Sequence, residues 1–355
     1  MEGEEQRRRI GVIGPGGVGG VLAAGLAAAG HEVLLAARPR SVRAVRAEGL
    51  RLLAAGREQV HRLAADELLP GPVDLAVCAT KAFDAEAALR ANAAALRGAT
   101  VVVVQNGLRG LEAARAALGP DARVLGGLAL FAATKLEPGR IELTSPGELV
   151  LGSGAGRAGA DADRAAGLLG SAVPCRAVAN FPGAQWTKLL VNQVNAIPAA
   201  TGLSVQQTGE RAALRRLLAL AMRETLLLAR AAGVRPEPLG PIGRRGLFLL
   251  ERGRVHRAEL VARELCRSFG PVPNYASTLQ SIRRGAPTEN GELNGAIVRL
   301  GRRLRVPVPV NEVLNELVAR AERRGRPDGE AVLLRRTALL RRDEERSGPL
   351  RGGAR

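Results

Sequence analysis

A chain of 355 residues is long enough to bury two hydrophobic cores, and its 46% hydrophobic and 24% charged residues exclude a disordered or fibrous protein. The net charge of +18 would suit nucleic-acid binding, but the arginines are scattered through every segment, and aromatic residues on which bases could stack make up only 2%. Composition therefore disfavours nucleic acid as a partner.

Cysteine spacing and hydropathy predict the cellular setting. Cys78, Cys175 and Cys266 are far apart and form no CxxC pair, so we expect neither a disulfide framework nor a metal site, as in a reducing compartment. The chain contains no apolar run long enough to cross a membrane, and its first residues do not resemble a signal peptide. We expect a cytoplasmic protein that does not bind membranes.

The first elements predict a dinucleotide-binding loop. A short apolar strand at residues 10–13 leads into a glycine-rich turn, followed by a helix of small residues at 21–29 and a second strand at 32–36. Glycines between a strand and a helix allow a tight turn, close approach to a pyrophosphate, and phosphate binding at the helix N-terminus. The residues of this loop are Gly14, Pro15, Gly16, Gly17, Val18 and Gly19.

The end of the second strand predicts which dinucleotide binds. NAD sites usually carry a carboxylate there for the ribose hydroxyls, whereas this chain continues with Ala37-Arg38-Pro39-Arg40. A guanidinium suits the 2′-phosphate of NADP. The sequence therefore predicts NADPH as the cofactor, with Arg38 as a phosphate ligand.

Further strands and turns complete the predicted α/β domain. Lys81 and Asn106 each follow a strand at its C-terminal end, where open α/β sheets bind ligands; for Asn106, a plain Asn-Gly turn is the alternative. The other predicted elements are a small meander at 50–63, strands at 73–79, 101–104 and 124–132, a helix at 85–96, a hairpin at 139–152 that completes the sheet, and a last strand at 173–178.

From Pro182 onward the pattern becomes helical. We expect a Rossmann-type domain at 1–180, an all-helical substrate domain at 181–340, and a frayed tail at 341–355. The first predicted helix of this domain lies at 185–203, and the others lie at 210–232, 257–267, 293–304 and 311–323. A less regular stretch rich in Pro, Gly and Arg follows the helix at 210–232.

One predicted helix, at 185–203, carries an unusual polar stripe. Apolar residues surround it on most sides, but Lys188, Asn192 and Asn195 fall within roughly 60° of one another at the helical period. Burying these groups without partners would cost several kcal/mol, so the stripe should face water or a ligand. Only three of the 52 basic residues are lysines (Lys81, Lys135 and Lys188), and an ammonium can release a proton where a guanidinium cannot. These features favour a functional Lys188.

Taken together, these segments resemble the ketopantoate reductase family over residues 10–317. The resemblance lies in the glycine loop, in the segments around Lys81, Asn106 and Lys188, and in short matches at 277–280, 287–289, 293–295 and 309–311. It implies NADPH-dependent reduction of a 2-oxo acid, 2-dehydropantoate (ketopantoate) to pantoate in pantothenate biosynthesis, on a Rossmann-type domain followed by a helical domain.

The resemblance also implies a role for each site residue. Lys188 would donate the proton to the carbonyl oxygen, and the substrate would be held by Asn192, Asn195 and Ser277, the last through its carboxylate. The remaining implied contacts are Asn106 with both nicotinamide and substrate, Glu289 with the cofactor and the surroundings of the lysine, Ala132 with the nicotinamide side, and Arg38 with Lys81 at the adenosine phosphate.

Departures from the family pattern fall on the substrate side. The family commonly spaces its two helix asparagines four apart, whereas Asn192 and Asn195 are three apart and Ala196 occupies the expected position; Ser281 stands where the family has aspartate. Three alternatives therefore stay open: a reductase of the same family for another 2-oxo or β-hydroxy acid, a β-hydroxyacid dehydrogenase, and a non-catalytic NADP-binding sensor or RNA-associated protein. The oligomeric state is also open, with a homodimer among the options.

Overall fold

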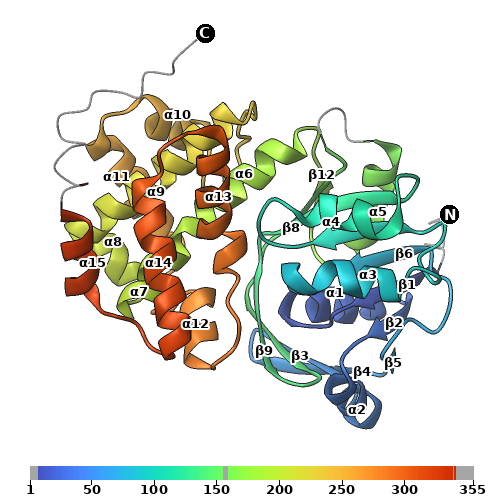
Figure 1. Cartoon of the computed structure of the whole chain (residues 1–355). Helices are drawn as coiled ribbons and strands as arrows, with labels where there is room; N and C mark the ends of the chain where they lie inside the picture. Colours follow the sequence, from blue (N-terminus) through green and yellow to red (C-terminus); the bar gives the residue numbers. More distant parts are fainter. Residues whose placement is uncertain (1–6, 155–158, 339, 341–355) are drawn as a thin grey trace. The chain divides into compact units, whose positions relative to one another are not determined.

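The computed structural model describes residues 7–154, 159–338 and 340 (Figure 1). Their contacts divide the chain into two compact units. The first unit runs to Gln105 and resumes from Arg109 to Phe181, and the second takes in Asn106–Leu108 and the chain from Pro182 onward. The tail expected to fray, 341–355, lies outside the described residues.

In the described part of the first unit, eight strands form one sheet in the order β12-β11-β8-β7-β6-β1-β2-β5. Strands β5, β2, β1, β6, β7 and β8 are parallel, while β11 runs antiparallel to β8 and parallel to β12. The order changes direction at β1, which has β2 on one side and β6 on the other, and ligands bind at such switch points. The strands are β1 (Arg9–Ile13), β2 (Glu32–Ala36), β5 (Ala64–Asp66), β6 (Leu75–Cys78), β7 (Thr100–Val104), β8 (Arg123–Ala129), β11 (Leu149–Gly152) and β12 (Cys175–Ala177).

Both faces of this sheet are buried. Successive side chains of a strand point to opposite faces, so Ile10 and Val12 of β1 lie in one hydrophobic cluster and Ile13 in another. The first cluster includes α1 (Gly17–Ala28), α2 (Pro39–Glu48) and α5 (Ala160–Gly170), and the second includes α3 (Ala85–Ala91) and α4 (Gly110–Leu118). Because helices cover both faces, the strands read as continuous apolar runs. The predicted Rossmann-type fold is confirmed.

A second, smaller sheet corrects two expectations. Within the described residues it has four strands in the order β4-β3-β10-β9, namely β4 (Arg57–His61), β3 (Leu50–Ala54), β10 (Arg140–Ser145) and β9 (Ala132–Glu137). The meander expected at 50–63 is an antiparallel pair that continues into distant strands. The hairpin expected at 139–152 is wrong, because β10 pairs with β9 and β3, while β11 joins the large sheet. Ile141 of β10 is fully buried against Gly20 of α1, a contact that local alternation does not reveal.

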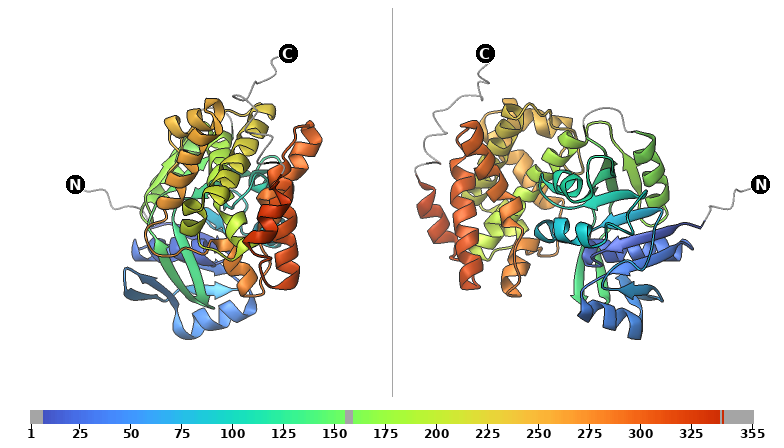
Figure 2. Two further views of the ribbon diagram at one scale, coloured as in Figure 1. Left: turned by 90° about the vertical axis from the view of Figure 1, so that its left-hand side faces the viewer. Right: turned by 45° about the vertical axis from the view of Figure 1, so that its right-hand side comes forward.

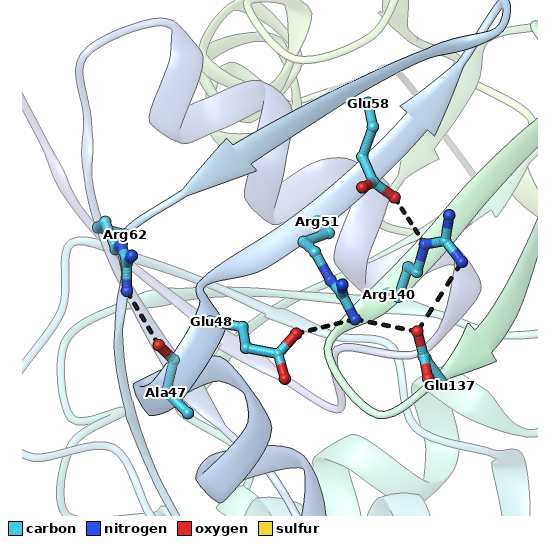
Figure 3. A network of polar contacts seen from close by, with 7 residues as sticks. All are labelled: Ala47, Glu48, Arg51, Glu58, Arg62, Glu137 and Arg140. Carbon is cyan, nitrogen blue, oxygen red and sulfur yellow. Dashed lines mark hydrogen bonds and ion pairs between the residues drawn. The ribbon is translucent and has the colours of Figure 1, made fainter.

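Some of the many arginines form ion pairs on the small sheet. Arg51 Nη2 lies 2.9 Å from Glu137 Oε1 and 3.1 Å from Glu48 Oε2, and Arg140 Nε lies 2.6 Å from Glu58 Oε1 (Figure 3). The carboxylates are a third to more than half exposed, so each pair contributes at most about 1 kcal/mol. The network therefore lies on a solvated face of the small sheet.

The described part of the second unit is built from helices (Figures 1 and 2). Its longest helix, α9 (Ala212–Ala231), is buried along most of its length and packs against α11 and α14. The helices are α6 (Phe181–Asn192), α7 (Ala196–Thr201), α8 (Val205–Glu210), α9, α10 (Arg244–Arg252), α11 (Val255–Arg267), α12 (Ser277–Arg283), α13 (Asn294–Leu304), α14 (Pro309–Arg324) and α15 (Glu330–Arg336), with 3-10 turns η2 (Gln193–Asn195) and η3 (Asn290–Glu292). The all-helical prediction is confirmed. Among the described residues, no helix combines the length and apolarity that crossing a membrane requires.

Two helical expectations need correction. The stretch expected to be less regular contains α10, which Gly243 and Gly253 flank and which buries Leu250. The helix expected at 185–203 is not continuous, because α6 ends at Asn192 and a 3-10 turn precedes α7. In a 3-10 helix residues three apart eclipse each other, so Asn195 lies beneath Asn192.

Candidate active site

The glycine loop connects β1 to α1 at the switch point of the large sheet. Gly14 has φ +84°, its N–H donates to the carbonyl of Ala36 (2.9 Å), and a Cβ there would lie 2.9 Å from the Thr80 nitrogen. Only glycine accepts this conformation at such close range without strain. Gly16 caps α1 without a side chain, which leaves the first N–H groups of α1 for an anion. The loop fits the pyrophosphate of a dinucleotide.

The expected adenosine-phosphate residues lie at the ends of β2 and β6, the two neighbours of β1. Arg38 follows β2, its side chain is 82% exposed, and its Nη2 lies 2.8 Å from Asp84 Oδ2. Lys81 is exposed at the start of the 3-10 turn η1 (Ala82–Asp84), which carries Asp84. Ala132, the expected nicotinamide neighbour, is exposed at the start of β9.

In the second unit, three expected site residues form a hydrogen-bonded chain. Asn106 Nδ2 donates to Glu289 Oε2 (3.2 Å), and Asn192 Nδ2 donates to Asn106 Oδ1 (3.2 Å). A carboxylate only accepts, so the amide of Asn106 must turn its nitrogen to Glu289 and its oxygen to Asn192. Residues far apart in the sequence therefore fix one another's orientation.

A second pair joins Asn195 to Ser277. Asn195 Oδ1 accepts from the backbone N–H of Ser277 (3.2 Å) and from its Oγ (3.1 Å), while Asn195 Nδ2 donates to the Asn192 carbonyl (2.9 Å). Asn192 and Asn195 are each 8% exposed, so this part of the stripe faces protein amides rather than open water. The two asparagines and the serine form one polar group.

The backbone before Ser277 is strained. Ala276 has φ +50°, a left-handed conformation that costs a residue with a Cβ about 1 kcal/mol or more, and its N–H donates to Asn274 Oδ1 (2.8 Å). Asn274 is held in turn by Gln206, whose Oε1 accepts from its N–H (2.9 Å). These contacts hold Ser277 at the first position of α12, opposite Asn195.

Lys188 lies on α6 one turn before Asn192. Desolvation by the surrounding protein lowers the pKa of its ammonium to about 8. Within residues 7–154, 159–338 and 340, no hydrogen bond or ion pair holds its Nζ. An ammonium with a lowered pKa next to an ordered amide chain is suited to donating a proton.

Several supporting residues were not predicted from the sequence. Thr288 is held by Glu322 of α14, which accepts from its N–H (3.1 Å) and its hydroxyl (2.6 Å), and this fixes the segment that carries Glu289. Gln185 Nε2 donates to the Gly107 carbonyl (2.9 Å) beside Asn106. Gln185, like Lys188, is a polar residue in the otherwise mostly apolar sequence of α6. That polarity was the one feature of the sequence that could have indicated its role.

A buried polar chain supports the 3-10 turn between the two asparagines. Glu224 of α9 accepts from the N–H groups of Val310 (2.8 Å) and Asn311 (2.9 Å) and from Asn311 Nδ2 (2.7 Å). Asn294 Nδ2 then donates to Asn311 Oδ1 (2.9 Å) and to Gln193 Oε1 (3.0 Å). The chain ties α9, α13 and α14 to η2, which begins directly after Asn192 and ends with Asn195.

Two models of one protein family match most of the chain. Residues 10–156 match the family described as Ketopantoate reductase PanE/ApbA, and residues 180–322 match its C-terminal domain. The chain belongs to the ketopantoate reductase family. It is therefore a dinucleotide-binding oxidoreductase that acts on CH–OH groups.

Individual members of the ketopantoate reductase family resemble the chain over nearly their whole length. A 2-dehydropantoate 2-reductase of Halobacterium salinarum is 33% identical over 328 residues, covering 89% of this chain and 100% of the relative. One from Mycobacterium tuberculosis is 30% identical over 324 residues, covering 88% and 97%. A solved PanE/ApbA family ketopantoate reductase from Ralstonia eutropha JMP134 has a TM-score of 0.75 and 29% identity, covering 89% and 99%.

A structure of D-mandelate dehydrogenase with NADH and anilino(oxo)acetate has a TM-score of 0.76, covering 89% of this chain and 99% of that one, at 22% identity. At that identity it shows a shared fold only. The fold of the ketopantoate reductase family therefore does not by itself identify the acid that is reduced.

Proposed function

We propose that this reductase converts 2-dehydropantoate to pantoate with NADPH, and that Lys188 donates the proton. The observation that carries the proposal is the Lys188 ammonium, with its pKa of about 8, one turn before an asparagine ordered by Asn106 and Glu289. Bound NADPH supplies the hydride for the carbonyl carbon.

Lys188 acts on the carbonyl oxygen. A pKa of about 8 keeps the ammonium mostly protonated at neutral pH, yet brings it close to the value at which proton transfer is most effective. As the carbonyl becomes an alkoxide, the positive charge of Lys188 stabilises it before the proton moves. General-acid catalysis of this kind typically contributes about 10²–10⁴-fold.

The amide groups hold the substrate. Ser277 can turn its hydroxyl to a substrate carboxylate, because its backbone N–H continues to satisfy Asn195 Oδ1. The second N–H of Asn195 and the amide of Asn192 then serve the substrate's hydroxyl or oxo group. Glu289 accepts a hydrogen bond from Asn106 and so fixes the amide that orients Asn192.

The residue that follows β2 is the reason for proposing NADPH as the cofactor. Arg38 occupies the position where NAD sites carry a carboxylate, and its guanidinium is largely exposed and available to a phosphate. Asp84 holds the guanidinium on one side and leaves its other N–H groups for a ligand.

The test is NADPH oxidation by the purified chain with a panel of 2-oxo acids that includes 2-dehydropantoate, 2-oxoisovalerate, pyruvate and an aromatic 2-oxo acid. We expect the highest kcat/KM with 2-dehydropantoate. A higher value with another acid would keep the reductase mechanism and assign a different substrate. Binding of NADPH without oxidation by any acid would instead favour the sensor alternative.

Replacing Asn195 with alanine should lower kcat/KM for the 2-oxo acid by roughly 10–100-fold, because a hydrogen bond to a polar or charged substrate group is lost and Ser277 loses its acceptor. The Kd for NADPH should stay within a few-fold. Steady-state kinetics and fluorescence titration measure the two quantities. Gln280→Ala on α12, which removes only an acceptor for Arg284, is the control and should change neither.

A further inference from the structure

In the first unit, a lysine contacts a serine hydroxyl next to the segment that carries two arginines. Lys135 of β9 extends to α2, where its Nζ lies 3.0 Å from Ser41 Oγ. Ser41 is 7% exposed, and its N–H donates to the Arg38 carbonyl (2.8 Å), so its position is set by the backbone that carries Arg38. The hydroxyl accepts from Lys135 and can still donate its own hydrogen.

The charge around Lys135 is not balanced. Desolvation lowers the pKa of Lys135, and the nearby positive charges of Arg38 and Arg40 lower it further. Among the described residues, no carboxylate forms an ion pair with Lys135 or Arg40, while Asp84 pairs with Arg38. The positive charges of Lys135, Arg38 and Arg40 therefore lie near enough to act on one another, and together they attract an anion.

The scarcity of lysine in the chain also favours a functional role for Lys135. Only three of the 52 basic residues are lysines, and the other two, Lys81 and Lys188, are already assigned to cofactor and substrate chemistry. Lys135 is partly buried on β9, and its ammonium reaches the hydroxyl of Ser41.

We propose that Lys135 and Ser41 complete, with Arg38 and Arg40, the site that recognises the phosphate monoester on the adenosine ribose of NADPH. A phosphate monoester carries nearly two negative charges and three acceptor oxygens, which match several cations and one hydroxyl donor. A carboxylate or an unmodified ribose would leave most of these groups unused. The assignment rests on the proposed preference for NADPH and adds residues from β9 and α2 to it.

The test measures ligand binding rather than activity. Calorimetry on the full chain compares 2′,5′-ADP, which carries the phosphate in question, with 5′-AMP, which lacks it. Lys135→Met keeps the length of the side chain and should weaken 2′,5′-ADP and NADPH roughly tenfold or more, while 5′-AMP and NADH stay within about twofold. Lys135→Arg should recover part of the loss. Arg43→Gln removes the same charge from an exposed position of α2 and is the control, expected to change neither ligand by more than about twofold.

The outcomes separate this inference from the proposed cofactor. If the unaltered chain binds 5′-AMP as well as 2′,5′-ADP, the preference for NADPH is wrong, and this inference is wrong with it. Another outcome is that the unaltered chain prefers 2′,5′-ADP, with the preference kept in Lys135→Met and lost in Arg38→Gln. That result would support NADPH as the cofactor and overturn the assignment of Lys135 to the phosphate site. Should Lys135→Met fail to fold, Ser41→Ala takes its place, with a several-fold loss for 2′,5′-ADP expected and an unchanged Kd contradicting the proposal.

Discussion

Replacing Lys188 with methionine is expected to lower kcat by roughly 10²–10⁴-fold, because the substitution removes both the proton donor and the positive charge that stabilises the developing alkoxide. The Kd for NADPH should stay within a few-fold, since the substitution leaves the glycine loop and Arg38 unchanged. Single-turnover reduction of 2-dehydropantoate measures the first quantity, and fluorescence titration measures the second.

A second substitution at the same position separates the two contributions. Lys188→Arg keeps the positive charge but cannot donate a proton at accessible pH, so it should recover only the electrostatic part of the rate. If Lys188→Arg retained most of the activity, Lys188 would not be the proton donor. If Lys188→Met did so, the whole mechanism would fail.

The lowered pKa of Lys188 also predicts a pH dependence. Reduction requires the protonated ammonium, so log(kcat/KM) should be flat below a pH of about 8 and fall with unit slope above it. Oxidation of the hydroxy acid requires the neutral amine and should rise through the same range. Both limbs should disappear in Lys188→Met. A reduction profile that stays flat to a pH of about 10 would contradict a pKa of about 8 for Lys188.

Replacing Glu224 with alanine is expected to destabilise the chain by about 3–5 kcal/mol. The buried carboxylate accepts from Val310 and Asn311, and each donor left unsatisfied costs about 1–3 kcal/mol. The loss should lower the Tm by roughly 6–20 °C, at about 2–4 °C per kcal/mol for a unit of this size. Differential scanning calorimetry and urea denaturation measure the change.

The control for this substitution is another glutamate of the same unit. Glu264 lies on α11 with its side chain 77% exposed, and its pair with Arg267 at 3.9 Å is solvated. Glu264→Ala should therefore change the free energy of unfolding by at most about 0.5 kcal/mol. A loss for Glu224→Ala no larger than that of Glu264→Ala would mean that the polar chain through Asn311, Asn294 and Gln193 does not stabilise the second unit.

The sequence by itself determined the features that depend on residues close together in the chain. The strand, glycine turn and helix from residue 9 to 28 follow from local spacing, because one turn both sets the backbone and forms the phosphate loop. Lys188 could be singled out because a lone cation in an apolar helix is costly unless it has a function, and because lysine is rare here.

Only the tertiary structure decided which distant groups meet. The pairing of β10 with β3, the chain from Asn192 through Asn106 to Glu289, and the contact of Lys135 with Ser41 each join segments separated by tens of residues. Nothing in local periodicity encodes such a pairing, since the same alternation of side chains also suited the hairpin that did not form. The choice depends on which arrangement buries Ile141 and gives the buried polar groups the most hydrogen-bond partners, and only the complete fold specifies that.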